Sequence, residues 1–276
     1  MSEKYTPGYS SNTINFMAYR TLDSHAGFFK PYLYPGMKLL DIGCGPGTIT
    51  MGLAKIVAPG TVTGIDKEAS QIRIAAENAV TQDIKNTNFL EANIYALPFL
   101  DNSFDAIFSH ALFEHLQSPA LALEELWRVL KPGGTIGLRS PDWGGFLITP
   151  TTPQLDQAIA YLKWILQQNS GNPYVGRELS GLLRQAGFTN IKASASYQCN
   201  ESLSSVTEYL ALIIEAFAKV DQVVQNNWAT EESITAMSRA LRQLSQHPDG
   251  WFASAWCEAV GQKGQTEAKV GNEVVL

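Results

Sequence analysis

The stretch that decides the fold reads Leu39-Leu40-Asp41-Ile42-Gly43-Cys44-Gly45-Pro46-Gly47, and a second run follows, Val62-Thr63-Gly64-Ile65-Asp66. The apolar beginning of the first stretch predicts a buried strand at 37–41, and residues 48–57 predict a helix. The glycines between them permit a tight turn and a close approach of the backbone to a ligand. The second run predicts a strand ending in an acid, whose carboxylate can accept hydrogen bonds from both ribose hydroxyls. Together the two stretches predict a nucleoside-binding site.

The glycine spacing distinguishes among nucleoside ligands. A dinucleotide site needs G-x-G-x-x-G, whose last glycine packs closely beside a pyrophosphate. Here Thr48 stands where that glycine would fall, and Pro46 removes a backbone donor that a phosphate would use. The spacing therefore disfavours a nicotinamide-dependent oxidoreductase. The pattern D-x-G-x-G-x-G resembles motif I of the class I S-adenosylmethionine-dependent methyltransferases.

Further motifs extend this resemblance over roughly Lys38 to Gly187. In order, they are Leu97-Pro98-Phe99, Asp101-Asn102-Ser103-Phe104-Asp105, Ser109-His110, Phe113-Glu114-His115-Leu116 and Arg128-Val129-Leu130-Lys131-Pro132-Gly133-Gly134. Each motif is weak alone, but their order and spacing are specific. The combination is similar to the small-molecule methyltransferases related to the quinone-biosynthesis group.

This resemblance implies an α/β fold, a Rossmann-like, doubly wound sheet of seven strands whose last strand is antiparallel. The sequence pattern predicts the strands at 37–41, 61–66, 87–91, 104–109, 135–139, 190–197 and 252–260. Helices are expected at 48–57, 70–80, 119–130 and 178–186, where apolar residues recur at helical spacing. One or two further helices are expected at 13–33, ahead of the first strand.

The chain divides into three expected parts. Residues 1–36 form a helical N-terminal cap, residues 37–261 the methyltransferase domain, and residues 262–276 a loose tail. Two insertions, 141–174 and 201–246, interrupt the domain; the first contains a helix at 155–168 and the second two helices. Both leave the sheet at the edge where open α/β folds bind ligands, so they are candidate lids. The alternative is that they only pad the edge of the sheet.

The resemblance also assigns cofactor-binding roles. Asp41, Gly43 and Gly45 would contact the methionine portion of S-adenosylmethionine. Asp66 would hold the ribose diol, with Lys67 beside it. Asn93 stands where many relatives carry Asp, and its amide oxygen can still accept from the adenine amino group while Ile94 packs on the ring.

The remaining candidates lie around the reacting groups. Ser109 and His110 would end the fourth strand beside the sulfonium, and His110 is the candidate base or acceptor contact because its ordinary pKa lies near working pH. A purely structural role for His110 is the alternative, and for Glu114 and His115 a structural role is favoured. Tyr19 and Arg20 lie on a leading helix, where Arg20 can pair with the cofactor carboxylate or simply be exposed. The aromatic rings of Trp143 and Phe146 can stack on an acceptor or belong to the core.

Composition narrows the class of protein. The chain has 276 residues, 45% of them hydrophobic and 17% charged, with a net charge of −6 and no run of Lys or Arg, which argues against a nucleic-acid partner. No stretch is long and apolar enough for stable membrane insertion, and the first residues lack a signal-like apolar core, so a cytoplasmic protein is expected. Cys44, Cys199 and Cys257 lack paired spacing, so no metal site is expected, although three cysteines leave arsenic methylation as an alternative.

The expected reaction is in-line transfer of a methyl group to O, N or C of a small, partly apolar metabolite, of secondary metabolism or a quinone precursor. The cofactor supplies the activated carbon, so the protein must orient two reactants and exclude water. The alternative is a non-catalytic protein that binds the cofactor as a sensor or partner subunit, because an intact cofactor half does not prove turnover.

Overall fold

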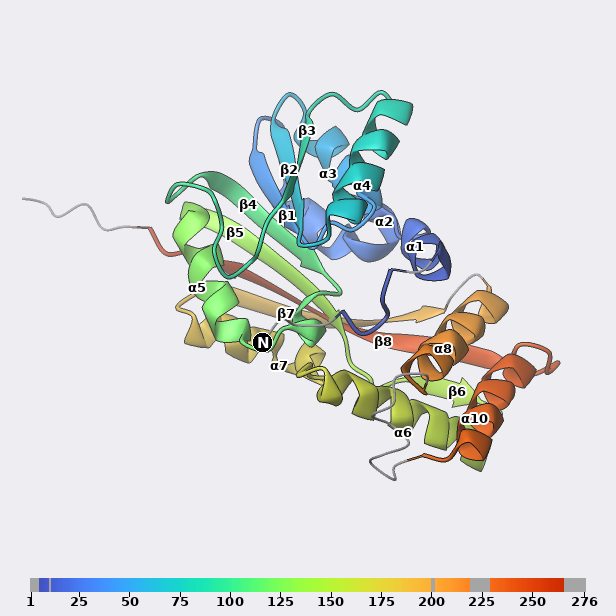
Figure 1. Cartoon of the computed structure of the whole chain (residues 1–276). Helices are drawn as coiled ribbons and strands as arrows, with labels where there is room; N and C mark the ends of the chain where they lie inside the picture. Colours follow the sequence, from blue (N-terminus) through green and yellow to red (C-terminus); the bar gives the residue numbers. More distant parts are fainter. Residues whose placement is uncertain (1–4, 10, 200–201, 219–228, 266–276) are drawn as a thin grey trace, which may run out of the picture.

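The computed structural model describes residues 5–9, 11–199, 202–218 and 229–265 (Figure 1). Its strands are β1 (Lys38–Ile42), β2 (Thr61–Asp66), β3 (Thr87–Glu91), β4 (Phe104–His110), β5 (Leu130–Pro141), β6 (Leu147–Thr149), β7 (Thr189–Cys199) and β8 (Trp251–Gln262). The described helices are α1 (Ser11–Ala18), α2 (Leu22–His25), η1 (Gly27–Tyr32), α3 (Thr48–Val57), α4 (Ala69–Thr81), η2 (Phe113–His115), α5 (Pro119–Val129), α6 (Pro153–Gln168), α7 (Val175–Gln185), α8 (Leu203–Ala218) and α10 (Glu231–Leu244).

One sheet organises the chain, in the strand order β3-β2-β1-β4-β5-β8-β6, with β7 paired to the other edge of β8. Strands β1 to β5 run parallel, whereas β8 is antiparallel to both β5 and β7. The predicted Rossmann-like sheet of seven strands with an antiparallel last strand is therefore confirmed. One further strand, β6, was not predicted, because three residues are too few to show an alternating pattern. It lies inside the first insertion and pairs with the start of β8.

Helices cover both faces of this sheet because its central strands bury side chains on both sides. In β1, Leu39 packs with η1 and α3, whereas its neighbour Leu40 points to the opposite face and packs with α5 and α7. Phe29 of η1 and Leu123 of α5 are fully buried on these two faces. The alternation explains why the mostly apolar first stretch forms a central strand.

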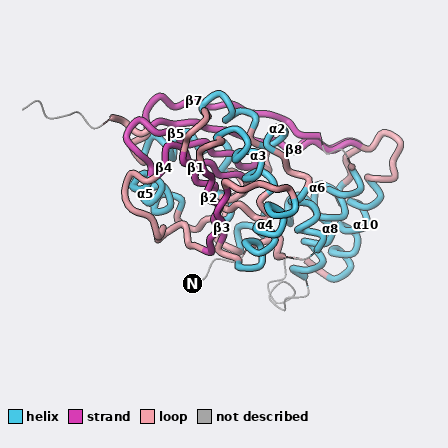
Figure 2. Tube along the Cα trace, turned by 90° about the horizontal axis from the view of Figure 1, so that it is seen from above, coloured by secondary structure: helices cyan, strands magenta, loops and turns pink. Residues whose placement is uncertain are grey.

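A separate helical group lies at one end of the sheet (Figures 1 and 2). Helices α6, α8 and α10 share an apolar core with Phe252 of β8. Arg242 of α10 also joins the group by hydrogen bonds to Glu208 (2.7 Å) and Glu215 (2.5 Å) of α8. The helices predicted within the two insertions are thus present, while residues 200–201 and 219–228 of the second insertion lie outside the described residues.

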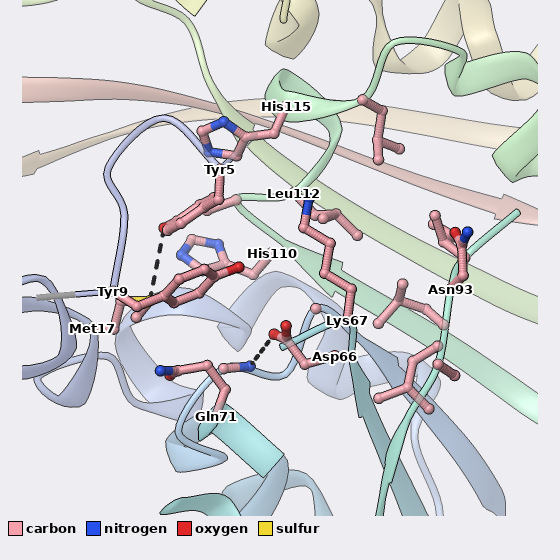
Figure 3. Close-up of a pocket in the computed structure, with 18 of the residues that line it drawn as sticks. Tyr5, Tyr9, Met17, Asp66, Lys67, Gln71, Asn93, His110, Leu112 and His115 are labelled. Atoms are coloured by element: carbon pink, nitrogen blue, oxygen red, sulfur yellow. Dashed lines mark hydrogen bonds between the residues drawn. The ribbon is translucent and has the colours of Figure 1, made fainter. Parts of the chain in front are cut away.

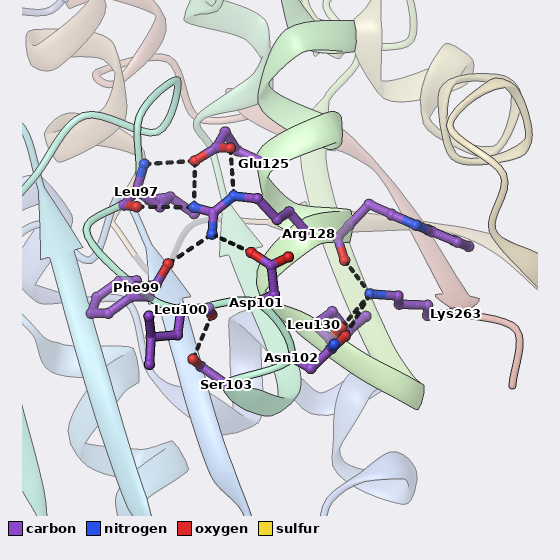
Figure 4. Close-up of polar contacts among 11 residues, drawn as sticks. Leu97, Phe99, Leu100, Asp101, Asn102, Ser103, Glu125, Arg128, Leu130 and Lys263 are labelled. Carbon is purple, nitrogen blue, oxygen red and sulfur yellow. Dashed lines mark hydrogen bonds and ion pairs between the residues drawn. The ribbon is translucent and has the colours of Figure 1, made fainter. Parts of the chain in front are cut away.

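The side chain of Arg128 contacts residues of several of the predicted motifs (Figure 4). Its guanidinium donates to the carbonyl oxygens of Leu97 and Phe99, at 3.0 and 2.7 Å, and pairs with Glu125 and Asp101. These contacts fasten the loop between β3 and β4 to α5. The motifs at 97–105 and 128–134 are therefore joined by structure, away from the cavities described below.

The ends of the chain agree in part with the predictions. Helices α1 and α2 and the turn η1 occupy the N-terminal segment predicted to be helical. The predicted loose tail at 262–276 begins at the last residue of β8, and residues 266–276 lie outside the described residues. In the part of the chain that the structure describes, no helix has both the length and the apolarity needed to cross a bilayer.

Candidate functional site

A cavity lined by both polar and apolar side chains opens where β1, β2 and β4 end (Figure 3). Its lining includes eight of the predicted site residues: Arg20, Gly43, Gly45, Asp66, Lys67, Asn93, Ile94 and His110. These residues come from five separate segments of the chain. The first cavity therefore gathers most of the candidates that the sequence placed on different strands.

The glycine loop forms the floor of the first cavity. Gly43 and Gly45 have φ values of +70° and +52°, a backbone conformation that residues with a side chain rarely adopt. A Cβ on Gly43 would also come within 3.3 Å of Leu112. The N–H of Gly45 donates to Asp66 Oδ2 at 3.0 Å, so the loop and the acid position each other.

Asp66 faces the cavity from the end of β2. Its Oδ1 accepts from the N–H of Glu68 at 3.0 Å, and its Oδ2 accepts from Gly45. A carboxylate oxygen accepts more than one hydrogen bond, so both oxygens remain available to a diol. Burial raises the pKa of Asp66 above its ordinary value, while the two backbone donors oppose that rise.

The opposite wall can hold a flat ring. Ile94 is buried at the edge of the cavity, and Asn93 Oδ1 accepts from the N–H of Tyr95 at 3.1 Å. Because an amide oxygen has two lone pairs, Asn93 can still accept an amino group. Lys67 also lines this cavity, next to Asp66.

Sequence reasoning missed several side chains of the first cavity. Gln71 is fully buried on α4, and neither of its amide atoms has a hydrogen-bond partner among the described residues. The sequence could have revealed Gln71, because it lies at helical spacing from Ala75 and Ala79 and so places a polar side chain on the buried face of a predicted helix. Tyr5, Tyr9 and Met17 also line the cavity; the two tyrosine rings stack at 5.1 Å, and Tyr5 donates to Met17 Sδ at 3.8 Å.

Three predicted residues, Asp41, Ser109 and Tyr19, are not among those that line the first cavity. Asp41 is buried beneath the loop, where it accepts from Thr50 Oγ1 at 2.6 Å, and burial raises its pKa to about 7. Ser109 donates to the carbonyl oxygen of Ile42 and so ties β4 to β1. Tyr19 is 72% exposed, because the end of α1 turns its ring outward.

His110 lies in the wall of the first cavity, with neither ring nitrogen hydrogen-bonded within the described residues. It stacks on Trp256 at 4.7 Å and meets His25 edge-on at 5.0 Å. Burial, with the nearby cations Arg20 and Arg139, holds the pKa of His110 well below its ordinary value. The imidazole is therefore neutral and offers one donor and one acceptor to a ligand.

A second, mainly apolar cavity adjoins the first beneath the helical group. Its apolar walls come from α1, both insertions and β8: Phe16, Trp143, Phe146, Leu162, Leu166, Val206, Tyr209, Leu210, Ile213, Phe252 and Trp256. The rings of Trp143 and Phe146, which the sequence assigned either to stacking or to the core, lie 4.9 Å apart and face this cavity. The cavity can therefore hold a flat, partly apolar molecule.

The two cavities share a wall made of Tyr5, Arg20, Ala111 and His115. Ala111 adopts φ +53°, a strained conformation for a residue with a side chain, directly after β4. The guanidinium of Arg20 forms no ion pair within the described part of the chain. A ligand in either cavity would meet this shared wall.

Comparison with known proteins gives the family. A methyltransferase-domain model matches residues 33–187, which is more than half of the chain. An uncharacterized methyltransferase of Schizosaccharomyces pombe is 34% identical over 204 residues, covering 71% of this chain and 73% of the relative. The chain belongs to the methyltransferase-domain family.

Two other relatives refine the comparison. A demethylmenaquinone methyltransferase of Staphylococcus aureus is 32% identical over 176 residues, covering 57% of this chain and 70% of the relative. A Haemonchus contortus phosphoethanolamine N-methyltransferase, solved with phosphomonomethylethanolamine and S-adenosylhomocysteine, has a TM-score of 0.58 at 17% identity. That match covers 92% of this chain and 58% of the solved one, and it supports the fold.

This methyltransferase is thus a class I, S-adenosylmethionine-dependent member of the family, as the motifs predicted, and S-adenosylmethionine is its cofactor. Membership in this family counts against the nicotinamide-dependent alternative. The described residues contain no group of three His, Cys, Asp or Glu side chains that could hold a metal ion. Cys44 is buried in the glycine loop, whereas Cys199 is exposed at the end of β7.

Proposed function

We propose that this methyltransferase moves the methyl group of S-adenosylmethionine by in-line displacement to O, N or C of a small, partly apolar metabolite. The observation that carries the proposal is the pair of unlike cavities with a shared wall. The first has charged and amide side chains among apolar ones and gathers residues of the family motifs, and the second is more apolar and lies against it. The quinone-type acceptor named for the Staphylococcus relative supports a partly apolar acceptor.

The cofactor would occupy the first cavity. In this assignment Asp66 holds the ribose diol, and Asn93 and Ile94 hold the adenine ring. The backbone of Gly43 and Gly45 contacts the methionine portion, whose carboxylate pairs with Arg20. Lys67 and Gln71 supply further donors, while Asp41 and Ser109 act only by holding the loop and β4 in place, and Tyr19 has no direct role.

The acceptor would occupy the second cavity under a lid. We assign the lid to the two insertions, through α6, α8 and α10, together with the N-terminal segment. Thr6 of that segment accepts from Asn169 at the end of α6 at 3.0 Å, so the two parts touch. Such a cover excludes water and holds the reactants in line, an effect worth up to roughly 7–11 kcal/mol of the barrier.

His110 remains our predicted catalytic contact, with its role narrowed by its surroundings. Because burial lowers the pKa of His110, the ring stays neutral and is a poor store for a proton. We assign it to hydrogen bonding with the reacting groups on the cofactor side. This role requires only its two unpartnered nitrogens and its place in the wall of the first cavity.

The test is incubation of the purified protein with methyl-labelled S-adenosylmethionine and a pooled small-molecule extract, followed by mass spectrometry. A labelled small molecule, absent when the protein is boiled, is the expected result. A parallel calorimetric titration separates the alternatives. Cofactor binding without any labelled product would favour the sensor or partner-subunit alternative, and no cofactor binding would contradict the assignment of the first cavity.

A further inference from the structure

Two buried titratable side chains occupy the turn that follows β4, between the two cavities. Glu114 and His115 belong to η2, and His115 is part of the wall that the cavities share. Glu114 is 3% exposed and lines the second cavity only. The sequence favoured a structural role for both residues. In the proposed function, however, they lie beside the path of the methyl group from the first cavity to the second.

The two side chains lie side by side, and no hydrogen bond to another described residue holds either nitrogen of the imidazole. Ser140 Oγ donates to Glu114 Oε2 at 3.0 Å, and Glu114 Oε1 lies 3.7 Å from His115 Nε2. His115 Nδ1 is buried and has no hydrogen-bond partner among the described residues. The Tyr5 ring packs edge-on against the imidazole at 4.7 Å and fixes its plane. A buried polar atom without a partner, in the wall of a ligand cavity, is a candidate ligand contact.

We propose that Glu114 and His115 form a proton relay for an acceptor whose reacting group is a phenol- or enol-type hydroxyl. His115 Nδ1 is the catalytic contact that takes the proton, and Glu114 is the positioning residue that receives the proton of Nε2. This inference rests on the proposed function. It names the acceptor class and the residues that act on it.

The step balances without any additional reactant. The acceptor O–H bond breaks as its proton passes to Nδ1, and the Nε2 proton passes to the Glu114 carboxylate. The acceptor oxygen uses its electron pair to form a bond to the methyl carbon, while the C–S bond breaks and its electrons stay on sulfur. Afterwards His115 is neutral again, Glu114 is protonated, and S-adenosylhomocysteine leaves with the methyl ether product.

The protonation states of the pair suit an acceptor that must lose a proton. Burial raises the pKa of Glu114 to about 7, and the Ser140 hydroxyl and the Arg20 cation oppose that rise. Burial, with the cations Lys67 and Arg20, lowers the pKa of His115 to about 3. His115 is therefore neutral and passes the proton on, and Glu114 is the group that can hold a proton near neutral pH.

The other groups that face Glu114 are neutral. Tyr5 of the N-terminal segment and Tyr209 of α8 both interact with Glu114, and burial raises the pKa of each hydroxyl. The loop before α7 contributes the N–H of Asn172, which donates to the Glu114 carbonyl oxygen at 2.9 Å. A neutral amine attacks through its free lone pair, whereas a phenol or enol hydroxyl becomes a better nucleophile when it loses its proton. A group that can take a proton at this place therefore suits a hydroxyl acceptor.

The experiment uses the acceptor found by label transfer and compares wild type with Glu114→Gln, Glu114→Asp and His115→Phe. We expect Glu114→Gln to lower kcat at least about 100-fold with little change in KM, as the loss of a general base does. In wild type, kcat should rise with pH through about 7, and this limb should vanish in Glu114→Gln. Glu114→Asp should restore part of kcat and the limb, and His115→Phe should lose kcat while its ring still packs on Tyr5.

Glu125→Gln is the matched control, because its carboxylate pairs with Arg128 and lines neither cavity. Calorimetry with S-adenosylmethionine should give unchanged affinity in Glu114→Gln, which shows that the variant is folded. A kcat and pH profile like those of wild type would overturn the inference, as would label on a nitrogen of the acceptor. No labelled product from wild type would instead overturn the proposed function, and this inference with it.

Discussion

The two cavities of this methyltransferase are built in different ways. The first is made largely from strand ends and turns, in which positive φ values at glycines and backbone N–H groups set the geometry. The second is made from side chains of the N-terminal segment, the loops after β4 and β5, the helices α6 and α8, and β8. Backbone turns need particular residues at fixed spacing, whereas an apolar wall needs only bulk. The first cavity is therefore strongly encoded in local sequence and the second only weakly.

The largest change that we expect is in the pH dependence of the free energy of unfolding, through Glu114 of the second cavity. Burial raises the pKa of Glu114 from its ordinary value of 4.5 to about 7. Its contribution to stability is therefore present below about pH 4.5 and is lost as pH rises through about 7, by up to about 3 kcal/mol. We expect Glu114→Gln, which cannot ionise, to gain stability relative to wild type between pH 5 and pH 8. Urea unfolding at both pH values measures this difference.

Glu125→Gln is the control for that series, because its carboxylate lies outside both cavities. If wild type and Glu114→Gln lose the same stability between pH 5 and pH 8, Glu114 is not the buried titrating group. Asp41 also has a pKa of about 7, but it is present in both proteins and cancels in the comparison.

The next effect concerns the first cavity alone. Asp66→Ala should weaken S-adenosylmethionine binding by about 1.5–3 kcal/mol, roughly 10- to 150-fold, because hydrogen bonds to a charged group are lost. Calorimetry measures the affinity, and Asp101→Ala, on the exposed side of the Arg128 network, serves as the control. Unchanged affinity in Asp66→Ala would remove Asp66 from the site.

The second cavity has its own, smaller test. Trp143→Leu should raise the acceptor KM by roughly 2- to 12-fold, because a stacked ring contributes about 0.5–1.5 kcal/mol beyond its buried area. The affinity for S-adenosylmethionine should not change. Steady-state kinetics with varied acceptor check this, with Trp251→Leu as the control, since Trp251 is exposed and lines neither cavity. An effect on cofactor affinity alone would contradict the division between the cavities.

The smallest effect has opposite signs for folding and for binding. Gln71→Leu removes a buried amide without partners among the described residues, so the unliganded protein should gain about 1 kcal/mol of stability. The same change should weaken S-adenosylmethionine binding by about 0.5–1.5 kcal/mol, because a hydrogen bond to the cofactor is lost. Thermal unfolding with and without cofactor measures both. A variant that loses stability in both states would show that Gln71 acts only in packing.

The fold could be predicted because its signals are local. The apolar run at 37–42, the glycines and the acid at 66 each report on their own segment, and all seven predicted strands are present. β6 was not predicted because its three residues are too few to show an alternating pattern. The helical group could be predicted as helices, but not how it packs, since that depends on contacts between distant segments.

The site could be predicted in part for the same reason. Asp66 and the glycines follow from spacing, whereas Tyr5 and Tyr9 reach the first cavity only because the N-terminal segment folds back over it. Asp41 was assigned to the ligand from the motif, but the Thr50 hydroxyl at the start of α3 satisfies its carboxylate from inside the loop. A motif identifies which residues matter, and burial decides which of them can touch a ligand.

A crystal structure of the complex with S-adenosylhomocysteine would show directly whether the first cavity binds the cofactor. The account predicts the ribose hydroxyls on Asp66, the adenine ring between Asn93 and Ile94, and the sulfur directed at the wall shared with the second cavity. S-adenosylhomocysteine bound in the apolar cavity, or with its sulfur turned away from His115, would contradict the division of this methyltransferase into a cofactor half and an acceptor half.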